Sequence, residues 1–143
     1  MTTWQAFQAI AFHSLHLTRY VWLVSVALVL AAVAALVIGV PLRHAQFRRR
    51  FGVLLLTYLI PVVIIGIGAV FRYDGPRTEY VEPAAWRGAI LWGVVLAHIL
   101  AVAAAVILMR GWRIRVFVVS LPGLWLSLST GFVSAIAIAG VGP

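Results

Sequence analysis

The sequence predicts an all-α integral membrane protein in which four transmembrane helices form an up-down-up-down antiparallel bundle. Hydrophobic residues make up 64% of the 143-residue chain, and the mean hydropathy is +1.11, whereas soluble domains are about 45–50% apolar. The apolar residues gather in four stretches, each close to the roughly 20 residues that a helix needs to cross a bilayer. Short links join these stretches and favour antiparallel neighbours. The chain is therefore expected to form a single transmembrane domain over residues 1–143.

A short amphipathic segment, residues 1–19, precedes the first span. Within it, Trp4, Phe7 and Ile10 recur at helical spacing. Helices of this kind usually lie in the headgroup region, where aromatic side chains anchor them. The segment has no basic region before an apolar run, so it does not resemble a cleaved secretory signal. We expect the segment to be an interfacial helix or the extended first turns of the first span, and we expect the first span to be retained.

The ends of the spans are marked by aromatic residues, prolines and arginines. Tyr20 and Trp22 lie at the start of the first span, where amphipathic rings favour the interface, and Pro41 marks its end. Pro61 lies near the centre of the second span, where it removes one backbone hydrogen bond and is expected to kink the helix. The expected spans cover about residues 20–40, 51–71, 88–109 and 116–140.

The arginines of the links predict how the chain threads the membrane. The links at residues 42–50 and 110–115 contain arginine and no acid, whereas the polar loop at residues 72–87 contains all three acids of the chain. Because cytoplasmic loops are enriched in basic residues, the two arginine-rich links are expected in the cytoplasm. Both termini and the 72–87 loop are then on the non-cytoplasmic side of a bacterial inner membrane. The arginines expected to contact anionic lipid head groups or a partner are Arg43, Arg48, Arg49, Arg50, Arg110, Arg113 and Arg115.

The composition argues against several classes of function. A net charge of +8 would suit a nucleic-acid partner, but most of the arginines flank spans instead of forming one soluble patch, so no such partner is expected. The chain has no cysteine, which excludes disulfides and thiolate metal sites. It contains no glycine-rich phosphate loop, nucleophile elbow or metalloprotease helix. Glu79 and Glu82 lie in a polar loop, not in a pocket. We therefore expect no enzyme activity.

His98 is the one ionisable residue near the middle of an expected span. An intramembrane histidine can ligate haem iron, relay protons or bond a quinone carbonyl. The simpler interpretation is a neutral imidazole that makes one hydrogen bond inside the bundle, with Ser127, Ser129 or Thr130 of the fourth span as its partner. We favour the simpler interpretation because no second titratable group is expected at that depth.

His13 and His16 are three residues apart and share one helix face beside Arg19 and Tyr20. Two histidines need further ligands to hold a metal, and no carboxylate is near them in the sequence, so no metal site is expected. A haem b joining His16 to His98 would need both residues at one depth. A rise of about 1.5 Å per residue instead places His98 roughly 15 Å below the outer end of its span. Haem is therefore the less favoured interpretation.

Small residues recur every four positions on three of the expected spans, a spacing that lets helix backbones approach closely in lipid. These stripes either close the bundle internally, or one of them, with the fourth span favoured, docks a neighbouring subunit. Their members are Ala27, Ala31 and Ala35; Ala97, Ala101 and Ala105; and Ser127, Gly131, Ala135 and Ala139.

A bundle with so few residues outside its spans is suited to two roles, packing against other membrane helices and contacting lipid. We expect a small non-catalytic accessory subunit of a multisubunit membrane complex, with a bacterial respiratory or photosynthetic electron-transfer assembly as its host. Its partners would be membrane lipids, including anionic ones, and other membrane subunits, and it would need no cofactor. The alternative is an autonomous redox or transport protein that binds haem b, a quinone or a metal through His98 or through His13 and His16.

Overall fold

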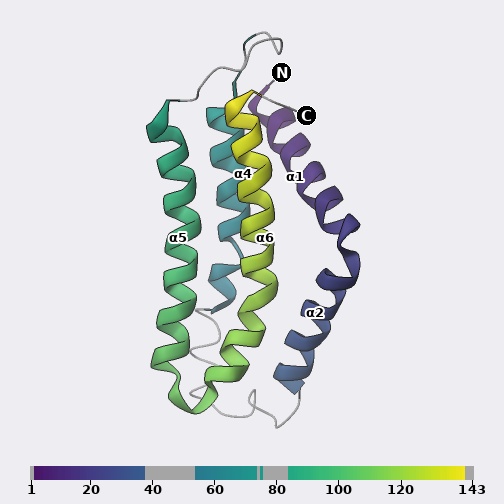
Figure 1. The fold of residues 1–143 in the computed structure, drawn as a ribbon, viewed down its shortest axis with the longest axis vertical. Helices are drawn as coiled ribbons and strands as arrows, with labels where there is room; N and C mark the ends of the chain where they lie inside the picture. Colours follow the sequence, from purple (N-terminus) through teal and green to yellow (C-terminus); the bar gives the residue numbers. More distant parts are fainter. Residues whose placement is uncertain (1, 38–53, 74, 76–83, 141–143) are drawn as a thin grey trace.

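The structure, a computed structural model, describes residues 2–37, 54–73, 75 and 84–140. Every regular element within these ranges is a helix. Figure 1 shows that α4, α5 and α6 run side by side, whereas α1 and α2 follow each other along one flank of the molecule. The elements are α1 (Thr3–Tyr20), α2 (Trp22–Val37), α4 (Ile60–Phe71), α5 (Ala85–Leu108), the short 3-10 helix η2 (Arg110–Trp112) and α6 (Arg113–Ala139).

Among the described residues, three helical stretches are long and apolar enough to cross a membrane. They are Leu54–Phe71, Ala85–Leu108 and Arg110–Ala139. The number rises to four if α1 and α2, which meet at an angle of 90°, count as one bent span. The expected all-helical chain with several membrane-crossing helices is confirmed at this level.

The N-terminal third of the chain differs from the sequence-based expectation. Instead of one continuous helix from Tyr20, the chain breaks at Val21, and α2 has only 16 residues. The preceding α1 packs on α4 and α6 along the bundle (Figure 1). Ala6 and Ile10 of α1 are buried in one cluster with residues of both helices. The small and aliphatic face of α1 thus makes a helix contact that a one-dimensional pattern does not reveal.

The start of α1 is closed by a capping box. The backbone N–H of Gln5 donates to the Thr2 hydroxyl at 3.2 Å, and the Gln5 side-chain oxygen accepts from the Thr2 N–H at 2.8 Å. These two bonds satisfy backbone donors that a helix start otherwise leaves open.

Pro61 interrupts the second predicted span. Residues 54–57 are helical, a turn follows at 58–59, and Pro61 then occupies the first turn of α4, where its missing N–H costs least. The hydroxyl of Thr57 donates to the Leu54 carbonyl at 2.6 Å, and the Tyr58 hydroxyl donates to the Val119 carbonyl of α6. The first bond satisfies a carbonyl beside the break, and the second ties the break to α6.

Helix α6 is the common partner of the other helices. It packs on α1, α2, α4 and α5 (Figure 1), and its buried side chains include five hydroxyl residues. Three of them donate to carbonyls one turn earlier in α6 itself, which lets hydroxyls be buried without an unmet donor. The buried hydroxyl residues are Ser120, Ser127, Ser129, Thr130 and Ser134.

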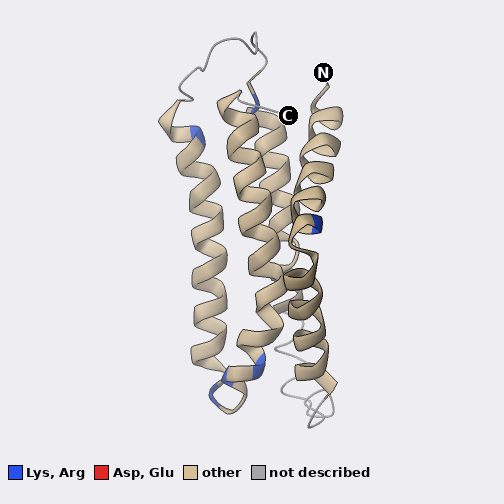
Figure 2. Ribbon diagram, turned by 45° about the vertical axis from the view of Figure 1, so that its right-hand side comes forward, with Lys and Arg blue, Asp and Glu red and all other residues tan. Residues whose placement is uncertain are grey.

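The described arginines lie mainly at the two ends of the bundle (Figure 2). Three of them follow one another in η2 and the first turn of α6, where α5 and α6 are joined. The other four arginines expected to contact lipid, Arg43, Arg48, Arg49 and Arg50, lie outside the described residues, as do the three acids Asp74, Glu79 and Glu82.

Candidate functional site

His98 lies in the middle of α5 and is completely buried, with an exposed fraction of 0%. Its Nδ1 is 2.7 Å from the Ser127 hydroxyl of α6. Ser127 is one of the three hydroxyl partners that the sequence predicted. One turn further along, α5 and α6 stay close, since a Cβ placed on Gly131 would lie 3.2 Å from Cγ2 of Val95. The imidazole therefore joins two closely packed helices.

The second ring nitrogen of His98 has no hydrogen-bond partner among the described residues, although it too is buried. A neutral imidazole has one N–H and one acceptor nitrogen, and the Ser127 hydroxyl can pair with either form at Nδ1. Nε2 is thus an open donor or an open acceptor. A buried polar atom of this kind marks His98 as the strongest candidate for binding a small ligand between the helices.

His13 and His16 line a second feature, a cavity of about 250 Å³ between α1 and α6. The Nδ1–H of His13 donates to the Ala9 carbonyl at 2.7 Å, which leaves Nε2 as an acceptor. His16 Nε2 lies 3.3 Å from the Tyr20 hydroxyl. Phe132 and other apolar residues of α6 form the opposite wall. The two imidazoles thus face an apolar cavity, and the described part of the chain brings no third metal ligand to them.

His16 and His98 do not form a common site. His98 contacts α6 at Ser127, whereas the cavity beside His16 reaches α6 at Ile136. These two positions are nine residues, or two and a half turns, apart and therefore lie on opposite faces of α6. A haem joining the two histidines would have to pass through α6, so the described residues do not fit that arrangement.

Arg19 is a residue whose position the sequence analysis did not foresee. The indole N–H of Trp125 donates to the Ser25 hydroxyl at 3.2 Å, and Trp125 is near the middle of the 27-residue α6. Nearer the N-terminus, Ile10 of α1 shares a cluster with Val133 of α6. Val133 lies about 9 Å along the helix from the C-terminal end of α6. Because Arg19 lies between Ile10 and Ser25 in the chain, it is placed between the levels of Val133 and Trp125 along α6, and its side chain is exposed.

The bend at Val21 explains the position of Arg19 locally. Arg19 occupies the last turn of α1, where a cation interacts favourably with the unpaired carbonyls of a helix C-terminus. Exposed His16 and Tyr20 lie in the same C-terminal part of α1, where they also line the cavity between α1 and α6. These three residues, Arg19, His16 and Tyr20, are called the flank cluster below.

The small-residue stripes divide between the inside and the outside of the molecule. Ser127 and Gly131 of α6 are buried and Ala135 and Ala139 are half-buried, which favours internal closure, the first of the two alternatives, for this stripe. The stripes of α2 and α5 are mostly outside, with Ala27, Ala31, Ala97 and Ala101 exposed.

Three arginines, Arg110, Arg113 and Arg115, surround the start of α6. The first two are exposed, whereas Arg115 is half-buried, and its guanidinium lies 5.0 Å from the Trp112 ring centroid. Nη1 of Arg115 is buried and has no hydrogen-bond partner within the described ranges. No family model, curated protein or solved structure matches this chain.

Proposed function

We propose that this chain is a small non-catalytic accessory subunit of a multisubunit membrane complex. A bacterial respiratory or photosynthetic electron-transfer assembly is the host that we propose. The observation that carries the proposal is the flank cluster, because it places an exposed arginine far from either end of the bundle. Exposed small residues on α2 and α5 give neighbouring helices two further faces on which to pack.

The energetic argument concerns Arg19 in a bilayer. A charged side chain near the centre of a membrane helix costs about 2.5–3.5 kcal/mol, and such residues normally face protein or water instead of lipid. Within the described residues, Arg19 faces outward on the molecule. An acidic or strongly polar surface of a partner subunit would satisfy the guanidinium, and the hydroxyl of Tyr20 and the imidazole of His16 would extend the same polar contact.

The proposal includes a membrane topology. Helices α1 and α2 would form one broken span, and the stretches ending at Phe71, Leu108 and Ala139 would form three more. This arrangement is supported by the start of α1 and the end of α6, which lie at the same end of the bundle (Figure 1). The arginines of η2 and early α6 lie at the opposite end and would face the cytoplasm of a bacterial inner membrane.

The first prediction tests subunit assembly. The full chain, extracted from its own membranes in mild detergent, is expected to migrate within a large stoichiometric assembly. Arg19→Leu should move it to the free fraction, because truncating one partner of a buried charge pair costs about 2–5 kcal/mol. Migration in native gels, with the co-migrating chains identified by mass spectrometry, provides the measurement.

Arg87→Leu is the matched control, because Arg87 lies in the first turn of α5, at one end of the bundle. It should leave migration unchanged. A wild-type chain that migrates alone would overturn the accessory-subunit proposal. Wild-type assembly that survives Arg19→Leu would instead place the partner contact away from the flank cluster.

A second candidate function, an autonomous haem-, quinone- or metal-binding protein, is favoured by one observation, the unpartnered Nε2 of His98. The second prediction separates the two functions. For an accessory subunit, His98→Leu should lower stability by only about 0.6 kcal/mol, the average for an interhelical hydrogen bond in membranes. Ser127→Ala should cost a similar amount, since it removes the same bond.

The measurement combines unfolding in mixed detergent with the absorbance spectrum and the extracted quinone content of the purified proteins. Loss of a chromophore or of bound quinone in His98→Leu, but not in Ser127→Ala, would establish the second function. Identical spectra and similar small stability losses in both variants would exclude His98 as a ligand-binding residue.

A further inference from the structure

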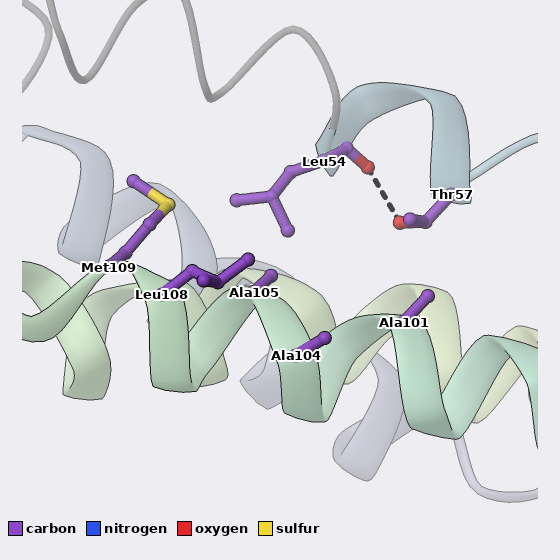
Figure 3. A pocket seen from close by; sticks show the side chains of 7 residues that line it. All are labelled: Leu54, Thr57, Ala101, Ala104, Ala105, Leu108 and Met109. Carbon is purple, nitrogen blue, oxygen red and sulfur yellow. Dashed lines mark hydrogen bonds between the residues drawn. The ribbon is translucent and has the colours of Figure 1, made fainter.

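An apolar groove of about 460 Å³ lies between the start of the 54–71 helical stretch and the C-terminal part of α5 (Figure 3). Three alanines of α5 make it hollow, because their side chains end at Cβ. The Thr57 hydroxyl bonds to the Leu54 carbonyl and offers no donor to the groove. The lining residues are Leu54, Thr57, Ala101, Ala104, Ala105, Leu108 and Met109.

The groove ends where the arginines begin. Met109, at its end, is followed directly by Arg110 in η2. Leu54 and Met109 also belong to a buried cluster against which Trp112 packs, and the Arg115 guanidinium lies over the ring of Trp112. Trp112 therefore connects two groove-lining residues to the Arg115 guanidinium.

The positive groups at this position favour an anion. Nη1 of Arg115 is buried without a hydrogen-bond partner in the described part of the chain. The long helix α6 has no side-chain cap at its start, and the positive end of a helix dipole favours an anion. Arg113 adds a further positive charge in the first turn of α6.

We infer that this groove binds one acyl chain of an anionic phospholipid, whose phosphate lies at Arg115 and the start of α6. Charge complementarity selects this occupant. A neutral apolar molecule would leave the guanidinium unpaired, and a free inorganic anion would leave the groove unfilled. In a phospholipid the apolar acyl chain is followed by a phosphate, just as the apolar groove is followed by the arginines. The inference goes beyond the accessory-subunit proposal and does not depend on it.

The test uses the full chain reconstituted in nanodiscs with phosphatidylcholine and phosphatidylglycerol of identical acyl chains. After transfer to mild detergent, native mass spectrometry counts the lipids that remain bound. One retained phosphatidylglycerol is expected, with phosphatidylcholine retained at least about tenfold less, since a hydrogen bond to a charged group contributes enough for one to two decades of affinity. Inorganic phosphate added at millimolar concentration should not displace the lipid.

Two variants address the two halves of the site. Arg115→Gln should lower phosphatidylglycerol retention about tenfold or more and remove the preference over phosphatidylcholine. Ala104→Phe, which fills the groove from the exposed face of α5, should lower retention of both lipids.

The matched controls are Arg87→Gln and Ala97→Phe. Arg87 also lies over a tryptophan, 5.5 Å from the Trp86 ring centroid, and has a buried unpartnered Nε, but it is outside the groove region. Ala97 is exposed on α5 and does not line the groove. Both should retain lipid as the wild type does. Equal retention of the two lipids by the wild type, or unchanged retention in both Arg115→Gln and Ala104→Phe, would overturn the inference.

Discussion

Gly68→Ala is expected to separate α4 from α6 and to lower the free energy of unfolding by about 1–3 kcal/mol, the usual cost of overpacking. A Cβ at Gly68 would lie 2.6 Å from both Cβ and Oγ of Ser134 and 3.1 Å from its Cα. Rotation of the serine side chain cannot relieve contacts with Cβ and Cα, so the helices themselves have to move. The Ser134 hydroxyl, which donates to the Ile64 carbonyl at 3.2 Å, would lose that bond as well.

Gly66→Ala is the matched control, because nothing lies within 4 Å of a Cβ at that position of the same helix. It should leave stability unchanged or raise it, since alanine is the better helix former. The double variant Gly68→Ala with Ser134→Gly should recover part of the loss by removing the serine Cβ and Oγ. Unfolding by sodium dodecyl sulfate in mixed micelles measures all four proteins. Equal stability of the Gly66→Ala and Gly68→Ala variants would contradict the close α4–α6 contact.

Leu91→Ala is expected to cost about 2–5 kcal/mol, the range for removing a fully buried leucine from a packed core. Leu91 has an exposed fraction of 0% and shares a cluster with Ile64, Val95 and Ile138 from α4, α5 and α6. This loss of stability is expected in a membrane as well as in water. Helix association in lipid depends on van der Waals packing, and the cavity would remove those contacts.

Leu100→Ala tests the same helix on its other side. Leu100 is nine residues from Leu91, hence on the opposite face of α5, and is 60% exposed. Its truncation should change the free energy of unfolding by less than about 0.5 kcal/mol, as surface substitutions usually do. The same detergent titration applies. A larger loss for Leu100→Ala than for Leu91→Ala would mean that α5 packs with the opposite face.

The site residues were predictable to different degrees. His98 stands out in the sequence as an ionisable residue inside an apolar stretch, and Ser127 was among three hydroxyl partners that helical spacing allowed. Spacing could not select Ser127, because that choice depends on how α6 is rotated against α5. Arg19 was read only as a neighbour of the histidines, since its height in the bundle depends on the bend at Val21.

The sequence by itself determined that the chain is all-helical, that several helices can cross a membrane, and that arginine gathers in particular links. These properties follow from the length of the apolar stretches and from the helical spacing of apolar residues, because both can be read from neighbouring residues in the chain. Only the tertiary structure decided that α1 packs against α4 and α6 and that the small residues of α6 face inward while those of α5 face outward. The physical reason is that an apolar helix face fits lipid and protein equally well, so close contacts such as Gly68 against Ser134 select its neighbour.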